Sequence, residues 1–322
     1  MDDQRADETT TIDPAVLDDR IWAGLQHAAS LGIVAVTEAG MTDWGYLESL
    51  LRLRERHGRL PVAVRLLVAS GLADGVGAGG VLTRRTGDPW VEVVGIKFYG
   101  DGWLGPRTCA LCDPFADRPG NTGILFLDAD TVARRSAPYA EAGLTLATHA
   151  IGDRAVAAVL DGYERVWSGD RVALATARPR IEHAQVLSTE LVSRLGELGV
   201  AACIQPSFAV SDRAAALAGL GAERADAAYD WQGLLAAAVP VLAGSDYPIE
   251  TLSPLQGLAD LSSGPGRSRL AVAVAFALMT DPLWGTVELS DDPRATPVGA
   301  IPDLTVIATD ATPLGPFCSG IS

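Results

Sequence analysis

Short apolar runs alternate with helix-patterned stretches from residue 19 onward. The run LTLATHA at 144–150, for example, is followed by Val156, Val159 and Tyr163, whose spacing places them on one face of a helix. Strands that alternate with helices predict a parallel sheet, and this number of units favours a TIM-type (β/α) barrel over an open sheet. The candidate strands are 33–39, 60–69, 91–100, 144–150, 180–186, 200–207 and 239–248.

One candidate strand carries a lysine where its alternation predicts the barrel interior. In VEVVGIKFYG, Lys97 falls on the opposite face from Val94, Ile96 and Phe98, which suit the helix layer. An unpaired lysine in a protein interior is very costly, so Lys97 needs either a function or water. The alternative interpretation is an edge strand that leaves Lys97 solvated.

Three further ionisable residues stand near the ends of other strands. His149 ends LTLATHA on its inward face, His183 lies at the end of RIEHAQV, and Asp246 ends the strand in PVLAGSDYP. A single histidine is more often a satisfied structural residue than a ligand. Together with Lys97, however, four such groups meet at the carboxyl-end rim, where barrel enzymes place their active sites.

Composition narrows the classes of partner and compartment. The 322 residues are 48% hydrophobic, which suits one large domain or a domain with an appendage, and the net charge of −15 argues against nucleic acid and anionic membranes. No apolar run reaches 18 residues, and the acidic stretch 1–18 reads as a disordered tail rather than a secretory signal. Four cysteines make no disulfide framework, so a reducing cytoplasm is expected.

Several motifs together resemble one known family. They are GIKFYGDGWLGPRT (95–108), THAIGDRAV (148–156), RIEHAQVLS (180–188), the stretch 220–250 and, more weakly, AIPDLTVIATD (300–310). In this order they resemble the amidohydrolase superfamily, in its amidohydrolase-3 branch, which includes N-substituted formamide deformylase-like proteins. The resemblance runs from about residue 20 to the C-terminus.

The resemblance implies a metal site and a reaction. Lys97 matches a lysine that many members carry as a carbamate bridging two metals, and His149 and His183 match metal-ligating histidines. Asp246 matches the aspartate that binds metal and handles the catalytic proton. The implied reaction is hydrolysis of an amide-type, non-peptide C–N bond by a metal-activated water, with Zn²⁺ as the expected metal.

The loop after the lysine strand adds two candidates. Asp101 and Arg107 lie in GDGWLGPRT and, by the resemblance, would line the substrate pocket. An ion pair between them that stabilises the loop is an equally good interpretation. Asp153 has a simpler role, as an acidic residue in the first turn of the following helix, where the helix dipole favours it.

The sequence departs from the family at its N-terminal side. The His-x-His of the family's first strand is absent, and His27 and His57 are isolated on helix-like segments. We therefore expect an incomplete barrel, strands two to eight over residues 19–290, with two exposed edges. Residues 291–322 resemble a remnant of the family's small β-domain.

These departures leave alternatives open. The site would hold one Zn²⁺ through Lys97, His149 and His183, or two if a missing segment supplies ligands. The chain is then an amidohydrolase for a small amide-like substrate, or an inactive or truncated homologue that serves as a binding scaffold. A decarboxylase or isomerase built on the same ligands is a third possibility. The exposed edges also favour a homo-oligomer.

Overall fold

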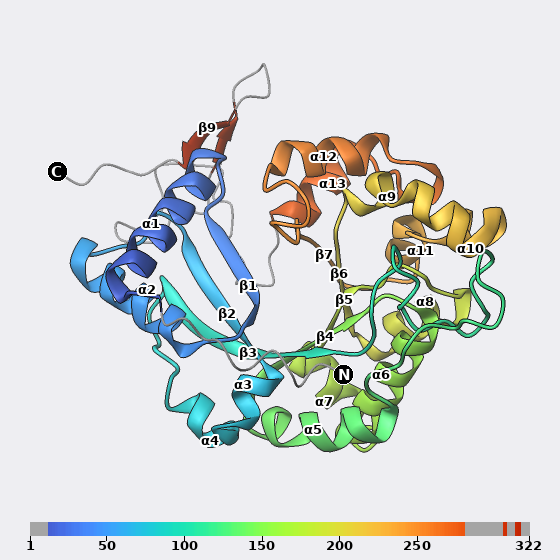
Figure 1. Ribbon diagram of the computed structural model, residues 1–322, viewed down its shortest axis with the longest axis horizontal. Coiled ribbons are helices and arrows are strands. Elements are labelled where there is room, and N and C mark those ends of the chain that lie inside the picture. Colours follow the sequence, from blue (N-terminus) through green and yellow to red (C-terminus); the bar gives the residue numbers. More distant parts are fainter. Residues whose placement is uncertain (1–11, 281–304, 308–312, 317–322) are drawn as a thin grey trace.

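A computed structural model describes residues 12–280, 305–307 and 313–316 (Figure 1). Its centre is one sheet of seven parallel strands in the order β1-β2-β3-β4-β5-β6-β7, so each strand pairs only with its neighbours in the chain. The strands are β1 (Ala35–Met41), β2 (Ala63–Ala69), β3 (Val91–Tyr99), β4 (Thr145–Ala150), β5 (Arg180–His183), β6 (Ala201–Ile204) and β7 (Val241–Ala243).

Helices follow most strands and cover the convex side of the sheet (Figure 1). They are α1 (Pro14–Ser30), α2 (Trp44–His57), α3 (Ser70–Asp74), α4 (Gly77–Leu82), α5 (Ala129–Glu141), α6 (Asp153–Val166), α7 (Arg171–Ala177), α8 (Thr189–Leu198), α9 (Phe208–Ser211), α10 (Arg213–Ala227), α11 (Trp231–Ala236), α12 (Pro254–Ser263), the 3₁₀ helix η1 (Gly266–Ser268) and α13 (Val272–Met279). Their ends follow local signals that the sequence predicts: Ser188 caps α8 through its hydroxyl, and Gly58 ends α2 in the left-handed region.

The sheet curls but does not close. Figure 1 shows β1 and β7 on opposite sides of a wide opening, and among the described residues neither strand has a second neighbour in the sheet. The fold is therefore a half-barrel of the TIM type, which confirms the expected class and the expected incompleteness. Two edges with unpaired backbone groups are its immediate consequence.

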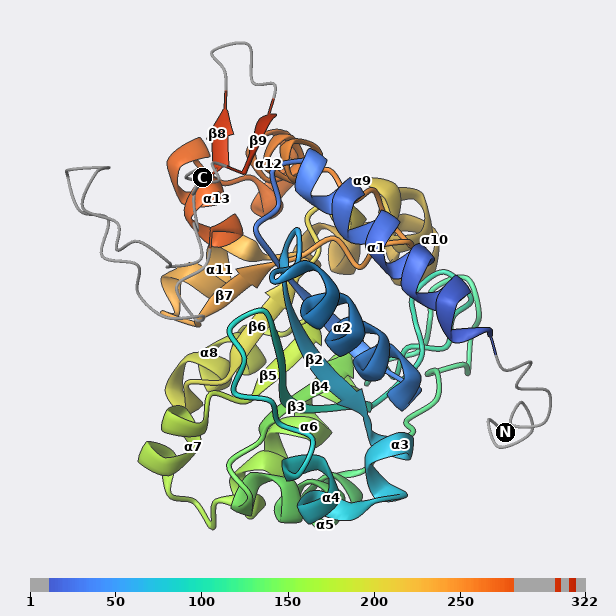
Figure 2. The same cartoon turned by 90° about the vertical axis from the view of Figure 1, so that its left-hand side faces the viewer.

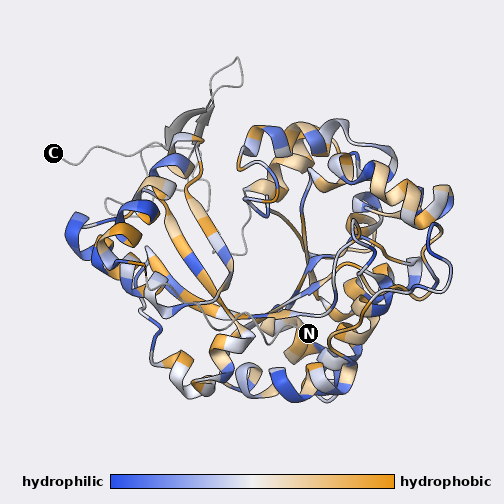
Figure 3. Cartoon of the chain, in the orientation of Figure 1, coloured by the Kyte–Doolittle hydropathy of each residue, from blue (hydrophilic) through white to orange (hydrophobic). Residues whose placement is uncertain are grey.

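The hydrophobic core lies between the sheet and the outer helices (Figure 3). Ile96 and Phe98 of β3 and Leu146 of β4 point into it, as their alternation predicts. Val94 does not. Val93 pairs with Leu66 and Gly95 with Leu67, so Val94 is the extra residue of a β-bulge and is not part of the buried core.

The N-terminal boundary is wrong in the prediction. Helix α1 begins at Pro14 and is capped by Asp13. Residues 14–18, which were expected to belong to a disordered tail, are therefore helical. Asp18 is buried between α1 and α2, which lie side by side in Figure 2, and pairs with Arg52 at 2.7 Å. This carboxylate reads as solvated in the sequence because its partners lie 31 and 34 residues away, at Ser49 and Arg52.

The C-terminal part is described only in two short strands. β8 (Thr305–Ile307) and β9 (Pro313–Pro316) pair antiparallel, within the stretch expected to be a β-remnant. The expected boundary between residues 290 and 291 lies outside the described residues.

Candidate active site at the carboxyl ends of the strands

Lys97 lies on the concave face of the sheet, near the carboxyl end of β3. The strand is central, between β2 and β4, and the residue is only 5% exposed, so the alternative of a solvated edge lysine is wrong. Its Nζ atom stands 5.3 Å from the centre of the Tyr99 ring. The Lys97 charge acts on the carboxylates of Glu38, Glu182 and Asp246, so the amine belongs to a group of ionisable side chains on this face.

Two histidines meet beside this lysine. His149 is the penultimate residue of β4 and His183 the last residue of β5, and their ring centres are 4.5 Å apart in an edge-to-face arrangement. His149 Nε2 lies 2.9 Å from the carbonyl oxygen of Gly102, and His183 Nδ1 lies 2.8 Å from Gln205 Oε1. Each ring thus has an acceptor for one N–H, and this assigns the lone pair to its other nitrogen.

The backbone at these strand ends is unusual. His183, Ala184 and Asp246 all have positive φ, at 78°, 47° and 55°, a region that non-glycine residues rarely occupy. At His183 the turn departs from strand alternation, because regular alternation would place it beside Ile181, in the core. Such conformations concentrate at functional sites, where the fold holds them against their cost.

Glu182 is a site residue that the sequence reasoning missed. It lies on the inner face of β5, buried, with its carboxylate 2.7 Å from Arg180 Nε. Burial alone would raise the pKa of Glu182, but the charges of Arg180 and Lys97 more than offset it and lower the pKa to about 2. The alternation of RIEH, with Ile181 outward, was the signal that could have revealed it.

Glu38 is a second missed carboxylate, on β1. It is exposed and lies two residues before Gly40, where a Cβ would lie 2.5 Å from the Tyr99 hydroxyl. Reduced hydration inside the curled sheet raises the pKa of Glu38, although the nearby Lys97 charge favours its ionised form. A glutamate within the apolar run IVAVTEA was its signal in the sequence.

Asp246 reaches the same region from a loop. β7 ends at Ala243, so the expectation that Asp246 ends a strand is wrong by three residues. Its pKa is raised, chiefly by reduced hydration, while Lys97 and His149 lie near enough to favour its charged form. Lys97, His149, His183 and Asp246 therefore converge at one rim.

Asp101 is held by backbone groups of the loop after β3 and of the end of β4. Its side chain is fully buried and accepts hydrogen bonds from the backbone N–H groups of Ala110, Ile151 and Gly152, at 2.8, 3.0 and 2.9 Å. One carboxylate oxygen also lies 3.3 Å from His149 Nε2. Asp101 therefore connects the loop after β3 to the end of β4, and its carboxylate lies beside the ring of His149.

Arg107 has no contact with Asp101, so the expected ion pair between them is wrong. Its guanidinium is buried and pairs with Asp117 at 2.7 Å, and it donates to the carbonyl oxygens of Leu104 and Gly105. These contacts fix the loop itself.

Three other polar residues have structural positions. Asp153 is in the first turn of α6, as expected, and also accepts a hydrogen bond from the Cys112 N–H at 2.8 Å. His27 is exposed on α1, and His57, in the last turn of α2, stacks on Trp22 with ring centres 3.9 Å apart. Neither histidine is part of the site.

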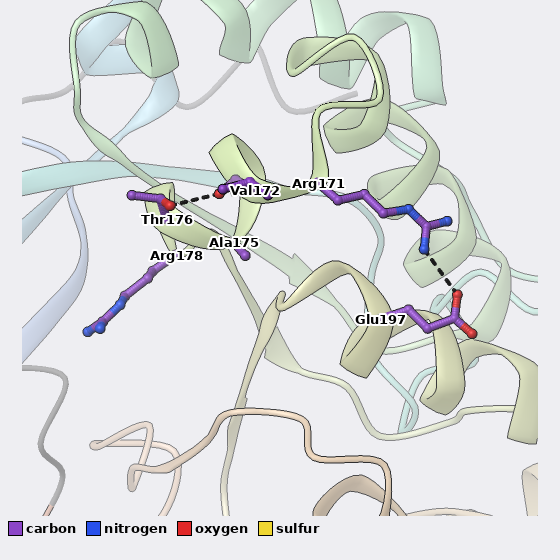
Figure 4. Close-up of a pocket in the computed structure, with 6 residues that line it drawn as sticks. All are labelled: Arg171, Val172, Ala175, Thr176, Arg178 and Glu197. Atoms are coloured by element: carbon purple, nitrogen blue, oxygen red, sulfur yellow. Dashed lines mark hydrogen bonds and ion pairs between the residues drawn. The ribbon is translucent and has the colours of Figure 1, made fainter.

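A surface depression between α7 and α8 lies elsewhere (Figure 4). Its lining includes Arg178, two residues before β5, and Glu197, near the end of the helix that precedes β6. It therefore belongs to the amino-end rim of the sheet, opposite the site. Its ion pair, Arg171 with Glu197 at 3.4 Å, is more than half exposed, and the depression carries no catalytic group.

Comparison with known proteins places this site in a family. A model of the amidohydrolase family, in its amidohydrolase-3 branch, matches residues 3–310. The chain belongs to the amidohydrolase family. This confirms the resemblance carried by the motifs around Lys97, His149, His183 and Asp246.

Among relatives of this amidohydrolase are two curated proteins. It is 28% identical over 314 residues to the putative amidohydrolase YtcJ of Bacillus subtilis, an alignment that covers 93% of this chain and 58% of YtcJ. It is 34% identical over 172 residues to the protein Long After Far-Red 3 of Arabidopsis thaliana, over 52% of this chain and 29% of that protein. The chain thus spans less than two thirds of either relative.

A solved structure is similar to this chain in both fold and sequence. An uncharacterised metal-dependent hydrolase from Pyrococcus furiosus superposes with a TM-score of 0.71 at 28% identity, over 84% of this chain and 55% of that one. In the part of the amidohydrolase that the structure describes, no helix has the length and apolar character needed to cross a membrane.

The donor set of this amidohydrolase fits a metal in part. Across residues 12–280 no three His, Cys, Asp or Glu side chains are grouped closely enough to hold an ion. His149 and His183 nevertheless each donate one ring N–H to an oxygen, which is the pattern of metal-ligating histidines. Catalytic zinc uses three protein ligands, so Lys97, as a carbamate, is the third candidate in this set.

Proposed function

We propose that this chain is part of a metal-dependent hydrolase that cleaves the C–N bond of a small, non-peptide amide. The observation that supports it most is the pair of buried histidines, His149 and His183, whose ring centres are 4.5 Å apart and which are each anchored through one ring nitrogen. Lys97, a lysine that is only 5% exposed on the neighbouring strand, adds a third candidate group.

In this proposal His149, His183 and a carbamate on Lys97 hold one Zn²⁺. When bound, the metal supplies Lewis acidity, which polarises a carbonyl and makes water a stronger acid. Asp246 takes the proton of the attacking water and gives it to the leaving amine, and its raised pKa suits a group that must both accept and donate. The products are a carboxylic acid and an amine.

A second candidate function is a binding protein without catalysis. The open sheet and the presence of only two imidazole ligands favour it for this chain alone, because three ligands are usual in a catalytic zinc site. Metal content separates the two candidates.

We expect the full chain, purified without chelators, to contain about one tightly bound zinc. A Lys97→Ala, His149→Ala, His183→Ala triple variant should lose it, because the proposed ligands are gone. Elemental analysis measures both, and His27→Ala, which removes an exposed histidine of α1, is the control that should keep the metal. A folded wild-type chain without stoichiometric metal would contradict the hydrolase proposal.

A further inference from the structure

Exposed aromatic rings gather around the candidate site. Among the described residues the exposed aromatic side chains are Tyr46, Tyr99, Trp103, Phe126, Tyr247 and Phe276. Four of these six belong to the end of β3, the loop that follows it, or the loop after β7. Exposed rings in segments that also carry site residues can bind the apolar part of a ligand.

Three of these rings are adjacent to site residues in the chain. Tyr99, 45% exposed, contacts both Lys97 and His149, with its ring centre 6.1 Å from that of the histidine. Trp103, 62% exposed, directly follows Gly102, whose carbonyl oxygen binds His149.

Tyr247, 58% exposed, directly follows Asp246 in the loop after β7. Phe126 lies near as well, because its backbone N–H donates to Gly100, the residue after β3. These rings therefore belong to the carboxyl-end segments of the sheet, the rim, and the ionisable side chains on the concave face form the floor of the site.

The floor and the rim differ in chemistry. Glu38, Glu182, Asp246 and Lys97 make the floor polar, which suits a reacting amide group. Of the two arginines in the loop after β3, Arg107 is buried against Asp117, and Arg118 is exposed with Nη1 3.4 Å from the Pro106 carbonyl oxygen. With a net charge of −15, the chain also repels anionic ligands.

We propose that the substrate is a neutral amide with an aromatic substituent, whose ring packs against Tyr99, Trp103 and Tyr247 while its C–N bond lies over Lys97 and Asp246. This inference rests on the proposed function and names its substrate class. Rings packed against rings gain free energy beyond the area that they bury, so removal of one rim ring weakens binding measurably.

Three probes separate the parts of this inference. N-(2-phenylethyl)acetamide is a neutral aromatic amide, N-methylacetamide lacks the ring, and N-acetylphenylalanine is the first probe with an added carboxylate. We expect the full chain to bind the first probe at least about 10-fold more tightly than the other two in NMR titrations. Trp103→Ala and Tyr247→Ala should each weaken it about 3- to 10-fold, whereas Tyr46→Ala, on α2, should not.

Each outcome decides between the inference and the function beneath it. If N-(2-phenylethyl)acetamide binds but releases no amine, the ligand class stands and the hydrolase proposal fails. If N-methylacetamide or N-acetylphenylalanine is cleaved as fast as the first probe, the hydrolase stands and the inference fails. Equal binding by wild type and both folded rim variants, or no binding of the first probe, would overturn the inference.

Discussion

Replacing Arg180 with methionine is expected to lower the free energy of unfolding by about 3–5 kcal/mol. The substitution keeps most of the side-chain volume but leaves the carboxylate of Glu182 charged and unpaired on the inner face of β5. Removing one partner of a buried ion pair costs far more than the pair itself contributes, because the remaining charge has lost its water as well. Urea denaturation of the full chain measures the loss.

The chain offers a matched control. Arg171 and Glu197 also form an arginine–glutamate pair, but both side chains are more than half exposed and the closest atoms are 3.4 Å apart. Arg171→Met should therefore change stability by less than about 1 kcal/mol. Similar losses in the two variants would show that Glu182 finds compensation that the structure does not reveal.

The same pair has a pH signature. The folded-state pKa of Glu182 is about 2, below the value of about 4.3 for an unfolded glutamate. A depressed pKa stabilises the fold at every pH above about 4.3, and this contribution disappears as the pH falls toward 2. Arg180→Met removes the larger of the two charges that lower this pKa, so the gap between wild type and variant should narrow from pH 6 to pH 3. A constant gap would contradict this assignment.

Asp101→Ala is expected to cost at least about 3 kcal/mol of stability. Three backbone N–H groups would lose a charged acceptor in a site that water does not reach. His149 would also lose the carboxylate behind it, so the nitrogen chemical shifts of its ring should change. Calorimetry measures the first effect and NMR the second.

Two variants test whether the buried position causes this effect. Asp101→Asn keeps the shape but can accept with only one oxygen, so its loss should be intermediate. Asp153→Ala removes a less buried aspartate that accepts from one loop N–H, at Cys112, and should cost only about 1 kcal/mol. A loss below that value for Asp101→Ala would mean that the loop reorganises around the substitution.

Regular strands made the first part of the site predictable. Lys97 lies in β3 after the bulge at Val94 and His149 lies in β4, in stretches where side chains alternate, so their inward direction follows from the apolar residues beside them. His183 was placed at the site by its position at a strand end, but its left-handed backbone could not be read from RIEHAQV. If His183 is assumed to follow regular alternation and to point inward, Glu182 is expected to point outward. The left-handed backbone at His183 breaks this alternation, and Glu182 takes the inward position.

The loops were beyond such reasoning. Proximity in GDGWLGPRT suggested a pair of Asp101 with Arg107, yet the loop turns Arg107 toward Asp117 and leaves Asp101 to backbone groups 9 to 51 residues away. No local pattern encodes contacts of that range. Asp18 shows the same limit, since its arginine partner lies on a different helix.

The pairing of each strand only with its neighbours in the chain also shapes how the molecule forms. Joining a first strand to a last one would require closing a loop over the whole domain, with its entropic cost, and this half-barrel avoids that step. As the ribosome extends the chain, each new strand can dock on the one made just before it. The growing sheet then presents a fresh open edge at every stage, so protection by chaperones is needed throughout synthesis rather than only at its end.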